Sequence, residues 1–231
     1  MTQRATLVAL LPMKAHSERV PGKNFRDFCG KPLFRWILDT LFGLEEIERI
    51  IINTDARDIL LEKGFEESLR VRLRERKREL CGDLVSMNHI LADDVGAVPA
   101  DTYLMTHTTN PLLGAETIRS ALTAYYAATM RGEADSLFSV TRFQSRFYRE
   151  DGSAVNHDPA ELVRTQDLEP WYEENSSLYV FSETSFRATG ARIGGKPLLF
   201  ETPAVEAVDI DDARSWELAR RLALGAQRDT S

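Results

Sequence analysis

The chain is poor in cysteine and has no long apolar run. Cys29 and Cys81 are the two cysteines among 231 residues, too few for a disulfide framework and not spaced like metal ligands. No apolar run comes near the roughly 18 residues that would span a membrane, and no secretion signal is recognisable. These absences predict a soluble protein of a reducing cytoplasm, with no membrane partner.

An excess of positive charge is missing as well. The formal net charge is −7 and the isoelectric point is about 5.3, whereas binding to a phosphate backbone needs a basic face. Nucleic acid is therefore not expected as a partner, and an anionic small substrate would have to be met by cations gathered locally. No Gly-x-Gly-x-x-Gly follows the first apolar run, which argues against a Rossmann-type oxidoreductase.

What is present suits one sizeable core. Hydrophobic residues make up 43% of the chain and charged residues 28%, and this length predicts a single domain over residues 1–231. Short apolar runs alternate with helical patterns, which is typical of an α/β sandwich on a mostly parallel sheet. The patterns predict strands at 6–11, 49–53, 102–106, 136–141 and 177–181, and helices at 32–42, 56–67, 115–130 and 211–224.

Two segments interrupt this alternation. Residues 62–80 are dense in Glu, Arg and Lys, and we expect most of these charges to lie on a solvated helix or loop face. In residues 143–175 the apolar periodicity gives way to polar and aromatic residues, including Phe147, Trp171 and Tyr172. Such aromatic side chains are costly to expose to water. The segment is therefore predicted to be a hairpin-like insertion or flap that needs a partner surface.

A loop rich in cations follows the first apolar run. Residues 7–11 carry no charge, as expected of a strand buried on both faces. Lys14, Arg19 and Lys23 then gather within ten residues, Ser17 adds a hydroxyl, and a Pro-Gly pair permits a tight turn. Cations and backbone N–H groups at the carboxyl edge of a parallel strand bind phosphate well. The loop is therefore a predicted phosphate-binding site.

Two carboxylates lie close together near the other end of the chain. Asp209 and Asp211 flank Ile210, so on an extended chain both project from one face. They repel unless a cation lies between them, and Mg²⁺ prefers one or two carboxylates completed by water and phosphate oxygens. Helix capping by Asp211 or Asp212 is the alternative interpretation. Asp209 comes too early in the chain to be that cap.

Five blocks of residues follow one another along nearly the whole chain. They are Pro12 with Ser17-x-Arg19-Val-Pro-x-Lys23-Asn24 and Gly30-Lys31-Pro32-Leu33; Gly82-Asp83 with Ser86-Met87-Asn88; His107-Thr-Thr-Asn-Pro111-Leu112; Gln166-Asp167-Leu168 with Tyr172 and Asn175; and Asp209-Ile-Asp211. In this order and spacing they resemble the sugar cytidylyltransferases that make CMP-activated 2-keto acid sugars. The fit is closest to the acylneuraminate cytidylyltransferase (CMP-sialic acid synthetase) family.

The resemblance implies a fold, a reaction and partners. The fold would be a three-layer, Rossmann-like nucleotidyltransferase fold in which residues 143–175 form a small β-rich dimerisation insertion. The enzyme would transfer CMP from CTP to the anomeric hydroxyl of a nonulosonic (sialic acid-like) sugar and release pyrophosphate. CTP, the 2-keto acid sugar and a second copy of the chain are the implied partners, and Mg²⁺ is the implied cofactor.

The resemblance also implies roles for individual residues. Catalysis would fall to Lys14, Arg19, Lys23 and Asp211. The nucleotide would be bound by Pro12, Lys14, Ser17, Arg19, Lys23, Asn24 and Arg76, the sugar by His107, Gln166 and Asn175, and Mg²⁺ by Asp209 and Asp211.

The chain departs from the family pattern on both sides of this site. Lys14 keeps the charge of the family's Arg without its bidentate fork. Glu18 replaces a cation, although Arg19 beside it is similar to the related KDO cytidylyltransferases. His107 stands where the family has a sugar-contacting Gln, and Ser176 where it has Gly. A nucleotidyltransferase that uses KDO, or GTP with a sugar phosphate, and a non-catalytic nucleotide-sugar binding protein therefore stay as alternatives.

Overall fold

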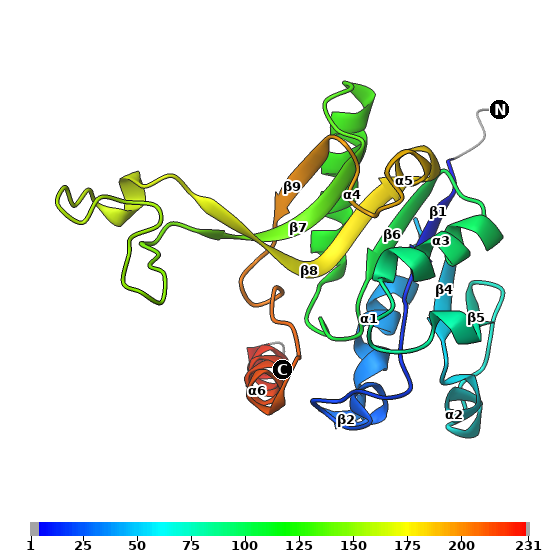
Figure 1. Cartoon of the computed structure of the whole chain (residues 1–231). Helices are drawn as coiled ribbons and strands as arrows, with labels where there is room; N and C mark the ends of the chain where they lie inside the picture. The colour runs from blue at the N-terminus through cyan, green and yellow to red at the C-terminus, as the bar shows by residue number, and fades with distance from the viewer. Residues whose placement is uncertain (1–4, 230–231) are drawn as a thin grey trace.

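Seven strands form one sheet in the order β5-β4-β1-β6-β8-β7-β9 in the computed structural model, which describes residues 5–229 (Figure 1). All neighbouring pairs are parallel except those that β8 makes with β6 and β7. A separate ribbon pairs β2 with β3. The strands are β1 Leu7–Leu10, β2 Asp27–Phe28, β3 Lys31–Pro32, β4 Arg49–Thr54, β5 Val71–Glu75, β6 Thr102–Thr106, β7 Ser136–Phe143, β8 Trp171–Ser182 and β9 Pro197–Glu201.

Helices cover both faces of the sheet, which confirms the predicted three layers. Side chains of α1, α2 and α4 share one core cluster with the sheet, and those of α3 and α5 share a second cluster on the other face. A third cluster joins α6 to the β2–β3 region. The helices are α1 Leu33–Phe42, α2 Arg57–Glu62, α3 Met87–Ala97, α4 Ala115–Met130, α5 Glu183–Thr189 and α6 Ala213–Asp229, with short 3₁₀ turns η1 Lys23–Phe25, η2 Arg78–Leu80 and η3 Thr165–Asp167.

The central strands and α4 follow the predictions closely, whereas the charged segment does not. The helix predicted at 56–67 ends at Glu62, and Gly64 then takes a left-handed turn with φ of 77°. The predicted solvated face at 62–80 contains β5, which pairs parallel to β4. Val71 and Leu73 are each 6% exposed. Their alternation with charged residues was a strand pattern, hidden by the density of charge.

The elements α3, α5 and β9 were not predicted. In α3 the buried stripe includes a carboxylate, Asp94, beside Ile90, Leu91 and Val95. This acid on the inner face interrupts the apolar periodicity from which a helix is inferred. The strand β9 lies at the edge of the sheet and pairs only with β7 among the described strands. Its short sequence did not separate it from the loops on either side.

The predicted insertion projects away from the body of the molecule (Figure 1). Strands β7 and β8 stay paired to Phe143 and Trp171, and the chain between them forms the arm. The rings of Phe147 and Trp171 stack with centroids 5.2 Å apart. Leu162 and Tyr172 nevertheless leave 65% and 46% of their surface exposed. The arm therefore covers only part of its apolar surface by itself.

Candidate active site

A pocket of about 390 Å³ opens where β1 and β6 end. Ligands bind at this edge in open α/β sheets, because the loops that leave neighbouring parallel strands diverge there. The loop after β1 forms one wall and the loop after β6 another. Six of the seven predicted nucleotide residues line the pocket: Pro12, Lys14, Ser17, Arg19, Lys23 and Asn24.

The loop after β1 is held by hydrogen bonds from distant parts of the chain. The backbone N–H of Met13 donates to the carbonyl of Asn53 at 2.9 Å, and the N–H of Ala15 donates to the Asp55 carboxylate at 2.6 Å. The Asn24 side chain donates to the Lys14 carbonyl at 2.8 Å and accepts from the Thr108 hydroxyl at 2.7 Å. Asn24 therefore joins the two pocket loops, and its predicted contact with the base stays a prediction.

Each of the three loop cations has an oxygen partner. Lys14 Nζ lies 2.7 Å from an Asp83 oxygen, and Arg19 Nη1 lies 3.0 Å from an Asp211 oxygen. Both pairs are half-exposed, and pairs of this kind stabilise a fold by about 0–1 kcal/mol. Phosphate oxygens can displace such carboxylates at small cost.

Lys23 differs from the other two cations because it is buried, at 9% exposure. Its Nζ donates to the Ile210 carbonyl at 2.5 Å, which ties the phosphate loop to the segment that carries the two acids. Burial lowers the pKa of Lys23, and the charges of Asp209 and Asp211 oppose that shift. The charges of Lys23 and Asp209 therefore each affect the pKa of the other group, and the charge of Asp211 affects both.

The residue between the two predicted metal ligands, Ile210, is fully buried in the cluster that includes Trp216. Asp211 lines the pocket. Asp209 lies deeper, and its Oδ1 is buried with no hydrogen-bond partner in the described chain. Burial raises the pKa of Asp209, with a hydrogen bond from Thr109 acting in the opposite direction.

The N-cap residue of α6 is the neighbouring acid, Asp212. The Oδ1 of Asp212 accepts from the backbone N–H groups of Arg214 and Ser215 at 2.9 and 2.8 Å, which is the N-cap arrangement. The Asp211 side chain instead faces Arg19. Within residues 5–229 no group of three or more His, Cys, Asp or Glu residues is placed to hold a metal ion. A cation here would take two carboxylates and the rest of its ligands from phosphate and water.

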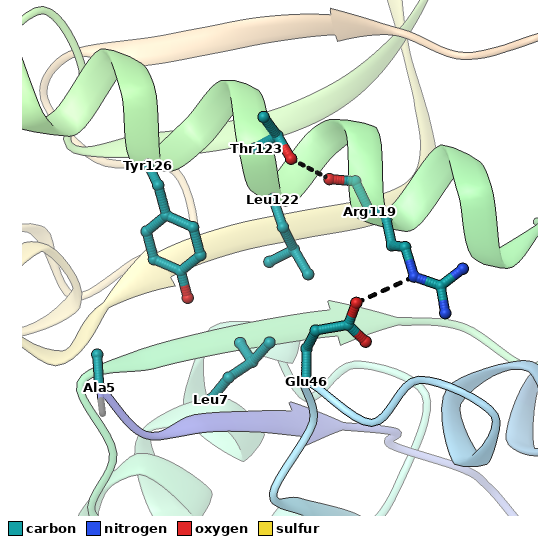
Figure 2. Close-up of a pocket in the computed structure, with 7 residues that line it drawn as sticks. All are labelled: Ala5, Leu7, Glu46, Arg119, Leu122, Thr123 and Tyr126. Carbon is teal, nitrogen blue, oxygen red and sulfur yellow. Dashed lines mark hydrogen bonds and ion pairs between the residues drawn. The ribbon is translucent and has the colours of Figure 1, made fainter. Parts of the chain in front are cut away.

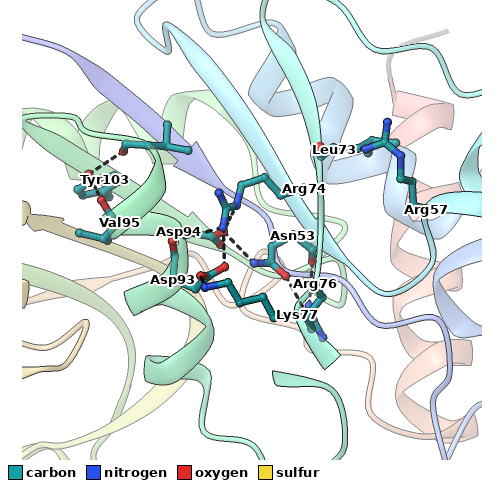
Figure 3. A network of polar contacts seen from close by, with 11 residues as sticks. Asn53, Arg57, Leu73, Arg74, Arg76, Lys77, Asp93, Asp94, Val95 and Tyr103 are labelled. Carbon is teal, nitrogen blue, oxygen red and sulfur yellow. Dashed lines mark hydrogen bonds and ion pairs between the residues drawn. The ribbon is translucent and has the colours of Figure 1, made fainter. Parts of the chain in front are cut away.

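Arg76 is not among the residues that line the pocket. It belongs to a network of polar contacts with Asn53 (Figure 3). It is 4% exposed, and its guanidinium donates to the carbonyls of Met13 and Asn53 at 3.1 and 2.8 Å. The Asn53 side chain in turn donates to Asp94 of α3 at 2.8 Å. Burial raises the pKa of Asp94 to about 6. In the free protein Arg76 thus stabilises the start of the loop after β1, through its hydrogen bond to Met13.

Of the three predicted sugar residues, His107 lines the pocket, whereas Asn175 and Gln166 do not. Burial together with the charges of Arg192 and Lys23 lowers the pKa of His107 to about 3. Asn175 is 8% exposed, and its amide donates to the hydroxyls of Thr141 and Thr202. Gln166 is exposed on the arm, in η3. His107 is thus a neutral hydrogen-bonding group in the pocket of this chain.

A second pocket, of about 470 Å³, lies at the opposite end of β1 (Figure 2). It is lined largely by apolar surface of β1 and α4, including Leu7, Leu122 and Tyr126. An ion pair of 3.0 Å between Arg119 and Glu46 borders it. It lies away from the carboxyl edge of the strands and has no cluster of cations. The smaller pocket is therefore the candidate active site.

Some pocket residues were not among the predicted ones. Asp83 reaches it from the segment before α3 and Met87 from the start of α3, while Thr108 and Thr109 come from the loop after β6. All four fall inside or beside blocks that carried the family resemblance. The position of each in a block was a signal, but its contact with the pocket needs the fold.

Comparison with known proteins assigns the chain to a family. The cytidylyltransferase family model matches residues 8–222. The chain belongs to the cytidylyltransferase family. It is 27% identical to the CMP-N,N'-diacetyllegionaminic acid synthase of Legionella pneumophila, over 94% of this chain and 95% of that protein. It is 21% identical to the pseudaminic acid cytidylyltransferase of Campylobacter jejuni, over 93% and 95% of the two chains.

Solved structures agree with this cytidylyltransferase fold. The structure of CMP:2-keto-3-deoxy-manno-octonic acid synthetase complexed with CTP matches 97% of this chain and 100% of its own, with a TM-score of 0.65 and 15% identity. A 4-diphosphocytidyl-2C-methyl-D-erythritol synthase matches 95% and 99%, with a TM-score of 0.66 and 14% identity. The predicted nucleotidyltransferase fold is confirmed. No described helix is long and apolar enough to cross a membrane.

Proposed function

We propose that this cytidylyltransferase transfers CMP from CTP to the anomeric hydroxyl of a 2-keto acid sugar and releases pyrophosphate. The observation that carries the proposal is the cation-lined pocket at the carboxyl edge of β1, in a chain of this family. The names of its relatives, synthases and cytidylyltransferases of nonulosonic acids, support the acceptor class. No comparison favours another nucleotide or a non-catalytic role.

In the proposed reaction the chain supplies position and charge. The acceptor hydroxyl attacks the α-phosphate, and the bond from the α-phosphorus to the bridging oxygen breaks as pyrophosphate leaves. Negative charge moves onto the leaving group during this step. Lys14, Arg19 and Lys23 surround the pocket where the triphosphate would lie. Fixed cations stabilise such charge without reorganising during the reaction.

The residues present fit the Mg²⁺ that the family resemblance implies. Asp209 has a buried oxygen without a partner, and Asp211 faces the same pocket through a half-exposed ion pair. These two carboxylates would hold the ion, with the remaining ligands from CTP and water. When bound, the ion neutralises phosphate charge and lowers the pKa of the acceptor hydroxyl.

We further propose that the protein is a homodimer in which the arm borders the partner's active site. The exposed Leu162, Trp171 and Tyr172 support this arrangement, because a monomer would leave them in water. Gln166 lies on the same arm, so its predicted sugar contact would be made in the partner's pocket. Light scattering tests the arrangement, and a monomer at micromolar concentration would contradict it.

A reducing cytoplasm stays the predicted location.

The reaction is tested by pyrophosphate release with each of the four nucleoside triphosphates. The acceptor panel is N-acetylneuraminate, N,N'-diacetyllegionaminate, pseudaminate and KDO. We expect release with CTP and at least one of these acceptors. Release with another triphosphate would replace the donor assignment, and binding without release would favour a nucleotide-sugar binding protein.

A further inference from the structure

A partly buried cation lies next to the pocket, outside the residues that line it, and has no role in the reaction described above. Arg192 belongs to the connection between α5 and β9, and its side chain is 18% exposed. The backbone N–H of Arg192 donates to the Asn88 side chain at 3.3 Å, at the start of α3. The guanidinium reaches Met105 Sδ at 3.9 Å. Met105 is near the end of β6, two residues before His107.

The guanidinium is held in one orientation by two residues of β8. It lies over the ring of Tyr179, with its central carbon 3.8 Å from the ring centroid. Its Nη2 lies 3.2 Å from Oε1 of Glu174. The Tyr179 hydroxyl donates to the same Glu174 oxygen. An Arg stacked and paired in this way loses little further side-chain freedom when it binds a ligand.

The backbone beside this cluster is strained. Ser176 has φ of 58°, in the left-handed region that favours glycine. The hydroxyl oxygens of Ser176 and Tyr179 lie 3.3 Å apart, within hydrogen-bond distance. Strain of this kind is unfavourable for a residue other than glycine and concentrates at functional sites. The chain thus maintains an unfavourable conformation at the place where Tyr179, Glu174 and Arg192 meet.

Arg192 lies beside the pocket wall without lining it, since its contact Asn88 adjoins the lining residue Met87, and its contact Met105 lies two residues before the lining residue His107. Together with burial and Lys23, the charge of Arg192 contributes to the lowered pKa of His107. The pairing with Glu174 uses one carboxylate oxygen and one guanidinium nitrogen, and Nε makes no hydrogen bond in the described chain. Donors therefore remain for a second anionic group. A carboxylate suits the guanidinium because its two oxygens match paired N–H donors.

We propose that Arg192 binds the carboxylate of the sugar acceptor, with Glu174 and Tyr179 as positioning residues that orient its guanidinium. This inference rests on the proposed function, since the acceptor class supplies the carboxylate. It also assigns different cations to the two anionic substrates. Lys14, Arg19 and Lys23 serve the triphosphate, while Arg192 serves the acceptor.

The test compares the KM for the acceptor with the KM for CTP in Arg192→Gln. The acceptor is the 2-keto acid sugar of the panel that gives pyrophosphate release, used as the free acid and as its methyl ester. We expect the KM for the free acid to rise roughly tenfold or more, because truncating one partner of a partly buried charge pair is costly, while the KM for CTP stays within about twofold. Wild-type preference for the acid over the ester should be lost in the variant.

Glu174→Gln separates recognition from structural support. It keeps the hydrogen bonds to Arg192 and Tyr179 but removes the competing negative charge, so the KM for the acid should not rise. Arg187→Gln in α5 replaces an exposed arginine that pairs with Glu183; it is the matched control and should match wild type. If Arg192→Gln melts at a lower temperature than the wild type, Arg192→Lys, which keeps the charge, takes its place in the comparison.

Two sets of results would overturn the inference, and a third would remove its basis. An unchanged acceptor KM in Arg192→Gln, or equal losses for acid and ester, would exclude carboxylate binding. An equal loss in Glu174→Gln would indicate a structural ion pair instead. Absence of pyrophosphate release by the wild-type protein with every acceptor would refute the proposed function itself, and the inference with it.

Discussion

The two sides of the pocket are encoded in different ways. The nucleotide side is built largely from one continuous stretch, residues 12–24, whose cations all line the cavity. The acceptor side that we propose would be assembled from the end of β6, from β8 and from the α5–β9 connection, which meet through contacts such as that of Arg192 with Met105. A site made by one loop can be predicted from the sequence, whereas a site made by three distant segments depends on how those segments pack.

The largest expected effect tests whether the acids at 209 and 211 complete the nucleotide side. Asp211→Asn keeps the shape of the side chain and removes the charge that would hold Mg²⁺. Pyrophosphate release should fall by two or more orders of magnitude, which is about 2.7 kcal/mol or more of transition-state stabilisation. Melting and metal-free CTP binding should hardly change, and Asp209→Asn should behave alike.

Asp212→Asn is the matched control, because Asn caps a helix about as well as Asp. Its turnover and melting should equal those of the wild type. Near-normal Mg²⁺-dependent release by purified Asp211→Asn would remove the metal assignment and leave the fold assignment intact.

A second prediction concerns the buried cation of the phosphate loop. Lys23→Ala should weaken CTP binding by about 1.5–3 kcal/mol, because it removes a charge-assisted hydrogen bond. Isothermal titration calorimetry measures the change. Lys31→Ala should matter less, since Lys31 pairs with Asp39 and lies over Trp36, outside the pocket lining. Equal affinities for CTP in wild type and Lys23→Ala would mean that the loop does not bind the triphosphate.

A third prediction uses the lowered pKa of His107 on the acceptor side. The folded protein keeps this ring neutral down to about pH 3, whereas the unfolded chain takes up a proton below about pH 6.5. Stability should therefore fall as the pH falls through this window. Between pH 6.5 and 5 the contribution is about 2 kcal/mol.

His107→Gln should remove that part of the pH dependence, and urea unfolding at the two pH values measures it. The other three histidines are unchanged in the variant, so they cancel in the comparison. Identical pH dependence in wild type and variant would show that His107 titrates normally and is accessible to water.

The smallest effect is expected at the ion pair between Lys14 and Asp83. Both side chains are half-exposed, so Asp83→Asn should lower the free energy of unfolding by less than about 1 kcal/mol. CTP affinity should not fall, because the substitution leaves Lys14 free for phosphate. A clear loss of CTP affinity would instead make Asp83 part of the nucleotide site.

Much of the fold could be predicted because its strands and helices have regular patterns. The helix at 115–130 and the strand at 102–106 have the predicted bounds. In residues 62–80 most charges are exposed as predicted. The helix or loop predicted there was wrong, because charges on the outer positions masked the buried Val71 and Leu73 of β5. The inner face of α3 carries Asp94, and an acid held by Asn53 and Arg74 is invisible to a rule that expects apolar residues there.

The sequence by itself determined that cations gather in the loop after β1 and that an apolar residue separates Asp209 from Asp211, because both features depend on neighbours along the chain. Only the tertiary structure decided which acid caps α6, that Arg76 donates to the Met13 carbonyl, and that the Asn175 side chain is occupied by Thr141 and Thr202. These outcomes depend on strand register and on contacts between segments far apart in the sequence. Local patterns encode which face a residue takes, but the partner it meets there is set by packing.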